Sequence, residues 1–525
     1  MARVQRALRL RIGLRLNTEG LTLAKHVQPR IFVTIAAPTL AAMEDQASNA
    51  GSSQVGFEWR LDYLHDIQNL ETRMHQMLFR LRFPQSIATC RREEAGGLFK
   101  GSVEEQAEVL QAAARAGCHW VDLENESITR AGAALLQSFT TSKTIVSYHD
   151  YRSMPALGEL YRKMSRLPVQ VVKIAVRGRN LADNLKVKKF LQAHRSGGPK
   201  VIAFSMGPSG IPSRLLSLKW GCHFTYASAC SHQAVASGQL PASVMRTVYR
   251  VEHLDHRTQI YGVVGSRASV SLSPSMQNAA FNAKRVNAVY LPCETNTLGD
   301  FLTFARHLNF GGFSVTMPYK RAIIKELDWI DPLAAQIGAC NTVAVQRGKW
   351  MGWNTDAAAV VEVLTKRLRL AGSRILILGA GGAARSAAFA LRGECAGVFL
   401  AARREASARQ LARAISAQVV PWGSADGLDV DALVNATPIG MAPNADAVPI
   451  DLARLRVRVV LDMVYYPMET RLLAEARGRG IITISGLEML VDQGARQFEI
   501  WTGQSAPRAL MEQAVRQGFD HTDMD

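Results

Sequence analysis

The sequence predicts an α/β chain of three consecutive units: a (β/α)8 barrel, a second α/β unit and a doubly wound parallel sheet. Three observations carry this prediction. Short β-like runs alternate with helical patterns from residue 30 to residue 250. A polar break over residues 250–258 precedes a new α/β pattern. A strand, a glycine loop and a helix then follow one another over residues 373–391.

The first unit contains eight runs that combine apolar and β-branched residues at the length of single strands. Amphipathic stretches such as residues 102–117 separate several of them, which is typical of parallel βα units. Eight such units in a segment of this length favour a closed barrel. The runs cover residues 30–36, 54–62, 85–91, 120–124, 144–150, 171–176, 201–207 and 223–228.

Polar residues gather at or near the carboxyl ends of these predicted strands. In (β/α)8 barrels the carboxyl ends form the mouth that carries the chemistry. A ring of charges that converges on one mouth is not explained by packing alone. The residues are Arg60, Asp62, Arg91, Asp122, Glu124, His149, Asp150, Lys173 and Met206.

Lys173 stands inside the apolar run VVKIAV. Burying an ammonium group is costly unless the group is paired or has lost its proton. One interpretation is an amine kept neutral for attack on a ketone, helped by burial and by nearby arginines. The alternative is a strand-end lysine that reaches water. A class I aldolase also uses a buried lysine and is a rival interpretation of the barrel.

The second unit spans residues 258–356 and contains IYGVVGS, NAVYLPCE, SVTMPYK and GWNTD. The third unit spans residues 357–486, where further β-like runs indicate a doubly wound sheet. The segment 487–516 is predicted to be a C-terminal helix that returns to the second unit. We therefore expect the second half of the chain to have two lobes.

The stretch ILILGAGGAAR is a buried strand followed by G-x-G-x-x-A and a helix. Gly379 permits the tight turn, and Gly381 lets the backbone approach a pyrophosphate at the helix N-terminus. The next strand ends in Arg403 and Arg404, whose guanidinium groups suit the 2′-phosphate of NADP. Glu405 follows directly, but the two arginines favour NADP over NAD.

Ordered motifs in the second half, among them SVSLSP, SVTMPYK, GACNTV, GWNTD, NATPIGM, LDMVYYP and EMLVDQG, resemble shikimate dehydrogenase. The resemblance implies a shikimate-dehydrogenase-like unit with an α/β substrate domain and a Rossmann NADP domain. It implies that Lys320 and Asp356 are catalytic. It implies substrate contacts at Ser271, Ser273, Thr316, Asn341, Tyr465 and Gln493. It implies cofactor contacts at Gly379, Ala380, Gly381, Gly382, Ala383, Arg403, Arg404, Thr437 and Gly486.

The first half carries FEWRLD, TCRREEAGG, SYHD, KIAV, SMGPSGIPSRLL and ASGQLP, and it resembles type I 3-dehydroquinate dehydratase. The resemblance implies a Schiff-base Lys173 and a proton-transferring His149. It implies substrate contacts at Glu58, Arg60, Arg91, Met206, Arg214 and Gln239. Two positions depart from the family pattern: Ala95 stands where a glutamate usually precedes the double glycine, and Val235 replaces the serine of a closing loop.

Together, the resemblances imply a bifunctional shikimate-pathway enzyme. The barrel would dehydrate 3-dehydroquinate to 3-dehydroshikimate through a Schiff base, and the second half would reduce that product to shikimate with NADPH. One alternative is a quinate/shikimate dehydrogenase whose dehydratase is weak or lost. Another is a non-catalytic regulatory homologue, which the retained reactive residues disfavour.

Composition narrows the partners and the compartment. The chain has 525 residues and a net charge of +18, yet no compact Lys/Arg run with interleaved aromatics, so nucleic-acid binding is disfavoured. No acidic residue occurs from Leu185 to Val251, which also fits a field that attracts small anions. Seven scattered cysteines without CxxC spacing indicate a reducing compartment and no structural metal.

No apolar run is long enough to cross a membrane, and we expect a cytoplasmic protein. Residues 1–29 form a basic extension that we expect to be disordered, with an organellar transit peptide as the alternative. The sequence leaves the oligomeric state open.

Overall fold

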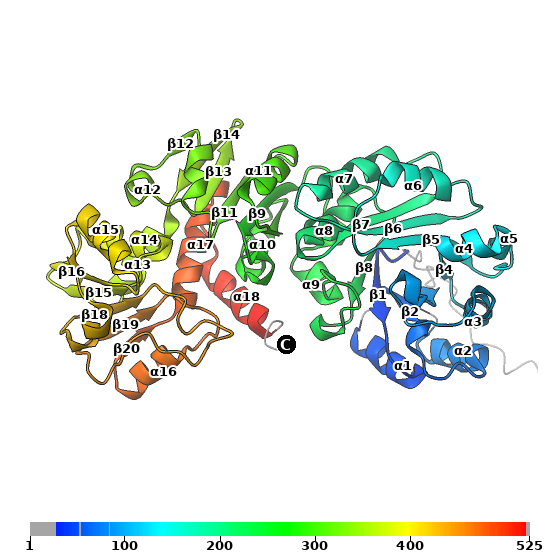
Figure 1. The fold of residues 1–525 in the computed structure, drawn as a ribbon, viewed down its shortest axis with the longest axis horizontal. Coiled ribbons are helices and arrows are strands. Elements are labelled where there is room, and N and C mark those ends of the chain that lie inside the picture. Colours follow the sequence, from blue (N-terminus) through cyan, green and yellow to red (C-terminus); the bar gives the residue numbers. More distant parts are fainter. Residues whose placement is uncertain (1–27, 52–53, 83, 521–525) are drawn as a thin grey trace, which may run out of the picture.

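The structure is a computed structural model that describes residues 28–51, 54–82 and 84–520. The predicted basic extension therefore lies almost entirely outside the described residues. The chain forms three α/β units in sequence order (Figure 1). The barrel lies at one end, the third unit lies at the other, and the second unit lies between them.

The barrel contains all eight predicted strands, parallel and in the order β7-β6-β5-β4-β3-β2-β1-β8. A backbone hydrogen bond crosses the seam from His223 N to Val201 O at 2.9 Å, so the barrel is nearly closed. The strands are β1 (Ile31–Ile35), β2 (Gly56–Arg60), β3 (Ser86–Thr89), β4 (Trp120–Glu124), β5 (Lys143–Asp150), β6 (Val171–Arg177), β7 (Lys200–Met206) and β8 (Thr225–Ser228).

The barrel helices lie outside the ring of strands (Figure 1). Helix α3 shows how local sequence fixes their ends: the Ser102 side chain accepts a hydrogen bond from Glu105 N at 3.1 Å, and the Glu105 carboxylate accepts one from Ser102 N at 2.7 Å. The helices are α1 (Leu40–Asn49), α2 (Leu70–Arg80), α3 (Val103–Arg115), α4 (Asn125–Ala131), α5 (Ala134–Gln137), α6 (Leu157–Met164), α7 (Asp183–Ala193), α8 (Ile211–Trp220) and α9 (Ala242–Thr247).

The second unit is a mixed sheet in the order β10-β9-β11-β13-β14-β12. Strand β13 runs antiparallel to β11 and β14, while β9, β10 and β11 are parallel. The strands are β9 (Gln259–Gly265), β10 (Ala288–Glu294), β11 (Gly312–Val315), β12 (Trp329–Ile330), β13 (Thr342–Gln346) and β14 (Lys349–Trp353). The helices are α10 (Ser273–Ala283), α11 (Leu298–His307), α12 (Pro332–Ile337) and α13 (Thr355–Thr365).

The third unit is an all-parallel sheet in the order β17-β16-β15-β18-β19-β20, so the doubly wound prediction is confirmed. The strands are β15 (Arg374–Leu378), β16 (Gly397–Ala401), β17 (Gln418–Val419), β18 (Ala432–Asn435), β19 (Val459–Asp462) and β20 (Ile482–Ile484). The helices are α14 (Gly382–Leu391), α15 (Glu405–Ile415) and α16 (Arg471–Gly478).

The C-terminal segment returns to the second unit, but it is two helices where a single helix over 487–516 was predicted. Helix α17 (Gly486–Thr502) ends at Gly503, whose φ of 67° is left-handed, and α18 (Arg508–Asp520) begins after Pro507. Glycine in this conformation ends a helix at little cost. Helix α17 contacts α10 and α13, and α18 packs on α10.

The barrel and the second unit share one continuous apolar core. The buried cluster that fills the barrel extends to Val289, Leu291, Phe301 and Phe313 of the second unit. Contacts of α8 with β10 and of α7 with α11 close this junction. One apolar cluster joins α12 and α13 of the second unit to the third unit, and a further cluster lies within the third unit alone. The first two units are therefore expected to unfold as one body.

Replacing Phe301 by alanine should lower the free energy of unfolding by about 3–5 kcal/mol, because a fully buried ring is lost and a cavity remains. When urea denaturation is monitored by circular dichroism, we expect the barrel and the second unit to unfold in one transition. Its midpoint urea concentration should be lower than in the wild-type protein. Leu376→Ala, which lies in the core confined to the third unit, is the control and should leave that transition in place. A barrel transition unchanged in the Phe301→Ala variant would contradict the shared core.

Candidate active sites

Lys173 lies within the barrel on β6, and its side chain is almost completely buried, at 4% exposure. Its Nζ lies 2.9 Å from Asp122 Oδ2 and 3.3 Å from Glu58 Oε1. The same atom lies 3.9 Å from the centre of the Tyr226 ring. The interpretation of a strand-end lysine in water is therefore wrong. The expectation of arginines as its direct neighbours is corrected as well, because the charged groups that touch it are carboxylates.

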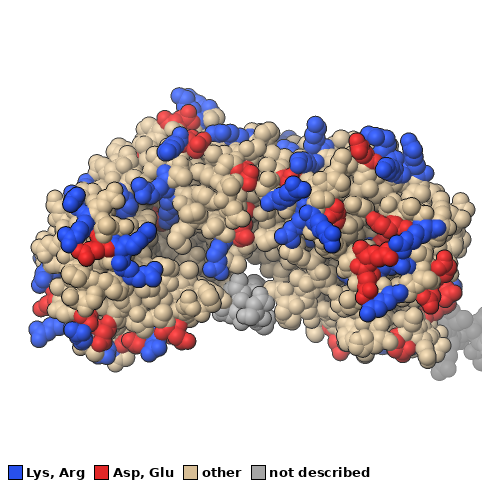
Figure 2. All heavy atoms as spheres, in the orientation of Figure 1, with Lys and Arg blue, Asp and Glu red and all other residues tan. Residues whose placement is uncertain are grey.

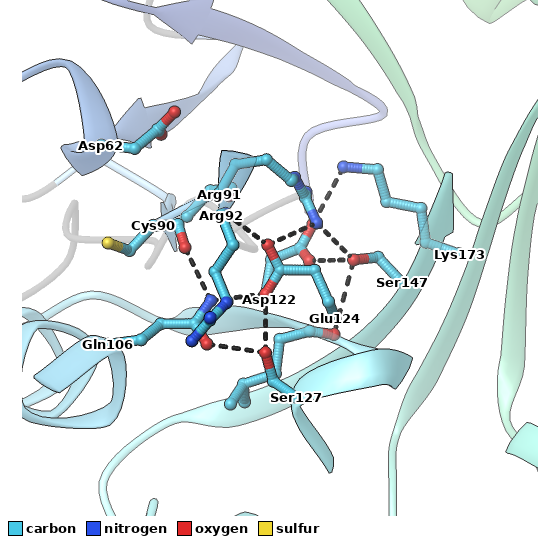
Figure 3. A network of polar contacts seen from close by, with 12 residues as sticks. Asp62, Cys90, Arg91, Arg92, Gln106, Asp122, Glu124, Ser127, Ser147 and Lys173 are labelled. Carbon is cyan, nitrogen blue, oxygen red and sulfur yellow. Dashed lines mark hydrogen bonds and ion pairs between the residues drawn. The ribbon is translucent and has the colours of Figure 1, made fainter. Parts of the chain in front are cut away.

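Asp122 joins the lysine to Arg91 (Figure 3). Arg91 donates to Asp122 Oδ2 at 3.1 Å and to Ser147 Oγ at 2.7 Å, and Ser147 donates to Asp122 Oδ1 at 2.5 Å. Burial opposes ionisation of Asp122, but the charges of Arg91 and Lys173 outweigh it and hold the pKa of this carboxyl well below its usual range. Asp122 is therefore an ionised, buried partner of two cations.

Glu124, which also lies close to Arg91, is held by further hydrogen bonds. Glu124 accepts hydrogen bonds from Gln106 Nε2 at 2.5 Å and from Arg92 N at 3.0 Å, and it lies 3.5 Å from Arg91. These groups surround Arg91 in Figure 3. A guanidinium group held by three carboxylate and hydroxyl partners has little freedom to turn away from the lysine.

Glu58 and Arg60 are two other predicted contacts. They lie two residues apart on β2, and each has polar partners of its own. Glu58 accepts hydrogen bonds from Thr34 Oγ1 at 2.8 Å and Thr89 Oγ1 at 3.1 Å. Arg60 makes a two-pronged ion pair with Asp62 at 2.8 and 2.7 Å. Each charge at this end of β2 therefore has a defined partner.

His149 lies near the carboxyl end of β5, and its ring stacks on Tyr151 at 6.3 Å between centroids. Burial, together with the positive charges of Arg91 and Lys173, holds the pKa of His149 well below its usual value. Its Nδ1 atom is buried and has no hydrogen-bond partner among the described residues. The ring is therefore neutral and ready to accept a proton.

Among the described residues, no carboxylate of the loop around Ala95 forms a hydrogen bond with His149. Ala95 is buried in a short turn, and Glu94 is turned to Arg130 with a 2.6 Å ion pair. Val235 in the other departing loop donates its backbone N–H to Gln239 Oε1 at 3.1 Å. Gln239 in turn donates to Thr34 Oγ1 at 3.0 Å, so this loop is tied to the barrel without the serine.

Arg214 on α8 is buried, yet its Nε and one terminal nitrogen have no hydrogen-bond partner among the described residues. The guanidinium lies 4.3 Å from the centre of the Phe204 ring. Burial lowers the pKa of Arg214 to about 10, so the group stays charged near neutral pH. Buried unpaired donors are costly, and they fit an anionic ligand group. Met206 is buried at the end of β7.

The second candidate site centres on Lys320, in the loop after β11, and Asp356, in the first turn of α13. Their side chains form an ion pair of 2.6 Å, and Asn341 Nδ2 donates to the other oxygen of Asp356 at 2.7 Å. The helix N-terminus also favours this carboxylate. Lys320 is 17% exposed at its side chain, so this amine is more open than Lys173.

The glycine loop lies beside this pair. A Cβ built on Gly382 would lie 3.5 Å from Lys320 Cδ, so the start of α14 and the lysine are neighbours. Gly379 has φ of 113°, and a Cβ there would lie 3.0 Å from Ala436 O. A Cβ on Gly381 would meet nothing within 4 Å. Ala380 and Ala383 complete a loop that leaves room for a pyrophosphate at the N-terminus of α14.

The other predicted substrate contacts of the second half make no hydrogen bond to Lys320 or Asp356 among the described residues. Ser273 N donates to Ser271 Oγ at 3.2 Å, and Gln493 donates to Leu490 O at 2.8 Å. Thr316 packs so closely on β9 that a Cβ at Gly265 would lie 2.4 Å from its methyl group. Tyr465 is half-buried, and burial raises the pKa of its phenol.

Around the predicted cofactor contacts, Arg403 and Arg404 are exposed directly after β16. Glu405 is engaged by Arg409, with Nε–Oε1 at 2.9 Å. Gly486 starts α17, where a Cβ would lie 2.3 Å from Val464 O. The arginines are thus free of the neighbouring acid, and these residues fit a 2′-phosphate better than a bare ribose hydroxyl.

Thr437 is fixed by a buried chain of polar groups. Asn435 Oδ1 accepts from Thr437 Oγ1 at 2.7 Å, and Asn435 Nδ2 donates to Asp462 Oδ1 at 2.9 Å. Asp462 also accepts from Thr470 at 2.6 Å, and burial raises its pKa to about 6. Asn435 and Asp462 are in register at the carboxyl ends of β18 and β19.

Sequence reasoning missed several residues at these sites. Asp122 was placed at the mouth but not among the site residues, and Ser147 and Tyr226 were not singled out. Gln497 was also missed: it accepts from Ser314 at 2.7 Å and lies one helical turn after Gln493 on α17. The i, i+4 spacing from Gln493 was the available signal.

Comparison with known proteins finds matches to both halves of the chain. Three family models match: type I 3-dehydroquinase over residues 31–256, the shikimate dehydrogenase substrate-binding domain over 263–343 and the shikimate 5′-dehydrogenase C-terminal domain over 486–516. A chloroplastic bifunctional 3-dehydroquinate dehydratase/shikimate dehydrogenase of Arabidopsis thaliana is 32% identical over 481 residues, covering 86% of this chain and 78% of that protein.

Two further similar proteins are the following. The shikimate dehydrogenase (NADP(+)) of Methanosarcina mazei is 41% identical over 273 residues, covering 49% of this chain and 97% of that protein. The solved dehydroquinate dehydratase and shikimate dehydrogenase from S. pombe AroM is 24% identical, covers 94% of this chain and 99% of that chain, and has a TM-score of 0.42. The chain belongs to the family of bifunctional 3-dehydroquinate dehydratase/shikimate dehydrogenases.

Proposed function

We propose that this chain converts 3-dehydroquinate to 3-dehydroshikimate in its barrel and then reduces that product to shikimate with NADPH. The observation that carries the proposal is the buried Lys173 between two carboxylates, beside a neutral His149. A second lysine–carboxylate pair lies next to a glycine loop in the same chain. Family membership supports both reactions.

In the first reaction Lys173 attacks the ketone of the substrate, and loss of water gives an iminium. Glu58 lies 3.3 Å from Nζ and is placed to take up the proton that the amine must lose, while the ionised Asp122 holds Nζ in position at 2.9 Å. The iminium withdraws electrons, so a proton on the adjacent carbon becomes removable. His149 takes that proton and returns it to the departing hydroxyl, which leaves as water. Hydrolysis of the imine then frees the product and Lys173.

Arg214 is proposed to hold the substrate carboxylate, because its buried donors have no partner among the described residues. Arg91 and Arg60 are already paired with acids, so they shape the pocket and contact hydroxyl groups of the substrate. Glu58, Met206 and Gln239 complete the wall. The replacements at Ala95 and Val235 remove two family groups, so we expect this reaction to be the slower of the two.

In the second reaction bound NADPH supplies the hydride. Lys320 donates the proton to the carbonyl oxygen, and Asp356, itself held by Asn341, keeps the ammonium in place. Ser271 and Ser273 are proposed to bind the carboxylate, while Thr316, Tyr465 and Gln493 orient the ring. Gly379 to Ala383, Thr437 and Gly486 would hold the pyrophosphate and nicotinamide ends, and Arg403 with Arg404 the 2′-phosphate.

We assign residues 30–250 to the dehydratase, 258–356 with 487–516 to substrate binding, and 357–486 to NADP binding. We place the protein in the cytoplasm, which its seven unpaired cysteines support. None of the described helices has the length and apolar character to cross a membrane. Rates of NADP-linked oxidation of shikimate and quinate would separate the proposed activity from that of a quinate dehydrogenase.

A coupled assay tests the proposal directly. With 3-dehydroquinate and NADPH, the protein should form shikimate. Lys173→Ala should stop product formation from 3-dehydroquinate but leave reduction of 3-dehydroshikimate intact. Lys320→Ala should reduce the second step by about 100-fold or more, as loss of a general acid does. Lys200→Ala, an exposed lysine at the opposite end of β7, is the control. Wild-type protein without either activity would revive the regulatory interpretation.

The pH profile of the dehydratase tests the role of His149. A general base works only when unprotonated, and the pKa of His149 lies well below its usual value. As pH falls, kcat/KM should therefore stay constant through pH about 6.5 and decline only at lower pH. Steady-state rates measured with 3-dehydroquinate at a series of pH values give the acidic side of this profile. A decline that begins above pH about 6.5 would contradict a neutral His149 as the base.

A further inference from the structure

A groove of about 310 Å³ lies at the junction of the barrel and the second unit. One wall is the segment 248–254 that follows α9, and the other is residues 278–288 of α10 and β10. None of the residues assigned to the two active sites lines it. Its volume is in the range of small-molecule pockets.

The groove presents unpaired hydrogen-bond donors from both units. Arg250 uses one nitrogen on Asn282 Oδ1, at 2.6 Å across the junction. The side chains of Arg285 and His253 have no hydrogen bond or ion pair within the described part of the chain. Asn278 is occupied with the backbone of Tyr290. The free donors are therefore the Arg285 guanidinium, the rest of the Arg250 guanidinium and the His253 ring.

The charge of the groove is positive. No aspartate or glutamate is among its lining residues. Two acids lie nearby: Glu252 pairs with Arg246 at 3.0 Å, and Asp255 accepts from Thr258 and from the groove residue Asn287, each at 3.1 Å. The acid-free stretch Leu185–Val251 runs from α7 to the groove segment after α9, and Figure 2 shows basic side chains over the region of α7 and α8.

Both groove arginines are exposed residues at turns of the backbone. Arg250 and Arg285 have φ of 50° and 55°, a left-handed conformation that occurs at tight turns. Guanidinium groups bind phosphate and carboxylate oxygens through two parallel hydrogen bonds. Tyr249, the tyrosine among the lining residues, is buried, and His253 is the lining residue with an exposed ring.

We propose that this groove binds a small multivalent oxyanion, such as a phosphate ester or a polycarboxylate, between Arg250 and Arg285. Because the arginines come from different units, the bound anion bridges the barrel and the second unit. Binding then favours the docked arrangement of the two units by mass action. The site is independent of the two reactions, and its test does not need turnover.

Calorimetric titration of the full chain tests the site, with pyrophosphate in one arm and citrate in the other. Saturating NADP is present in both arms, so that the glycine loop is filled. The wild-type protein should bind at least one of the anions saturably. Arg285→Asn should weaken this binding by about 10-fold or more, because a two-pronged charged contact is lost. Binding of pyrophosphate alone would indicate that the natural ligand carries phosphate. Binding of both anions would indicate that the groove accepts oxyanions more widely.

Two control variants localise the effect. Arg347→Asn removes the same charge from an exposed residue with φ of 51°, in the turn between β13 and β14, and should bind as the wild type does. Arg214→Gln disables the buried guanidinium of the barrel and should also retain binding. The proposal is overturned by three results: no saturable binding, equal affinity in Arg285→Asn and Arg347→Asn, or loss of binding in Arg214→Gln alone.

Discussion

A buried ammonium group must be compensated, and the barrel mouth is organised around that constraint. Lys173 is compensated by Asp122 and Glu58, and Asp122 is in turn compensated by Arg91. Removing one member of such a buried network leaves an unpaired charge, which costs about 3–5 kcal/mol. The network therefore fixes the positions of the groups while it keeps a proton acceptor against the reactive nitrogen.

The two sites need their lysines in different environments. In the barrel a nucleophile needs a dry pocket, and the side chain of Lys173 is only 4% exposed. In the second site an acid must deliver a proton and regain one, and Lys320 at 17% exposure keeps a path to water. The barrel also shares its core with the second unit, whereas the nucleotide-binding unit packs on α12 and α13 and has one further core of its own. A rigid dehydratase and a more independent cofactor lobe follow from this division.

Local patterns in the sequence were enough to predict the barrel strands, the glycine loop and the reactive lysines. Each of these signals lies within a few consecutive residues, where periodicity and turn chemistry act. Asp122 was harder to assign, because its role depends on contacts with β3, β5 and β6 that no local pattern reveals. The same holds for Asn435 with Asp462 and for Gln497, whose partners are far away in the sequence. The prediction of one helix over 487–516 gave too little weight to Gly503 and Pro507.

The most direct test of a lysine that forms an imine is to trap the imine. The protein is treated with sodium borohydride in the presence of 3-dehydroquinate, and the modified peptide is identified by mass spectrometry. One adduct of the mass of the reduced imine should form, on Lys173, and it should be absent when a sugar phosphate replaces the substrate. No adduct, or an adduct on another lysine, would contradict the central claim that the buried amine of β6 carries the dehydration.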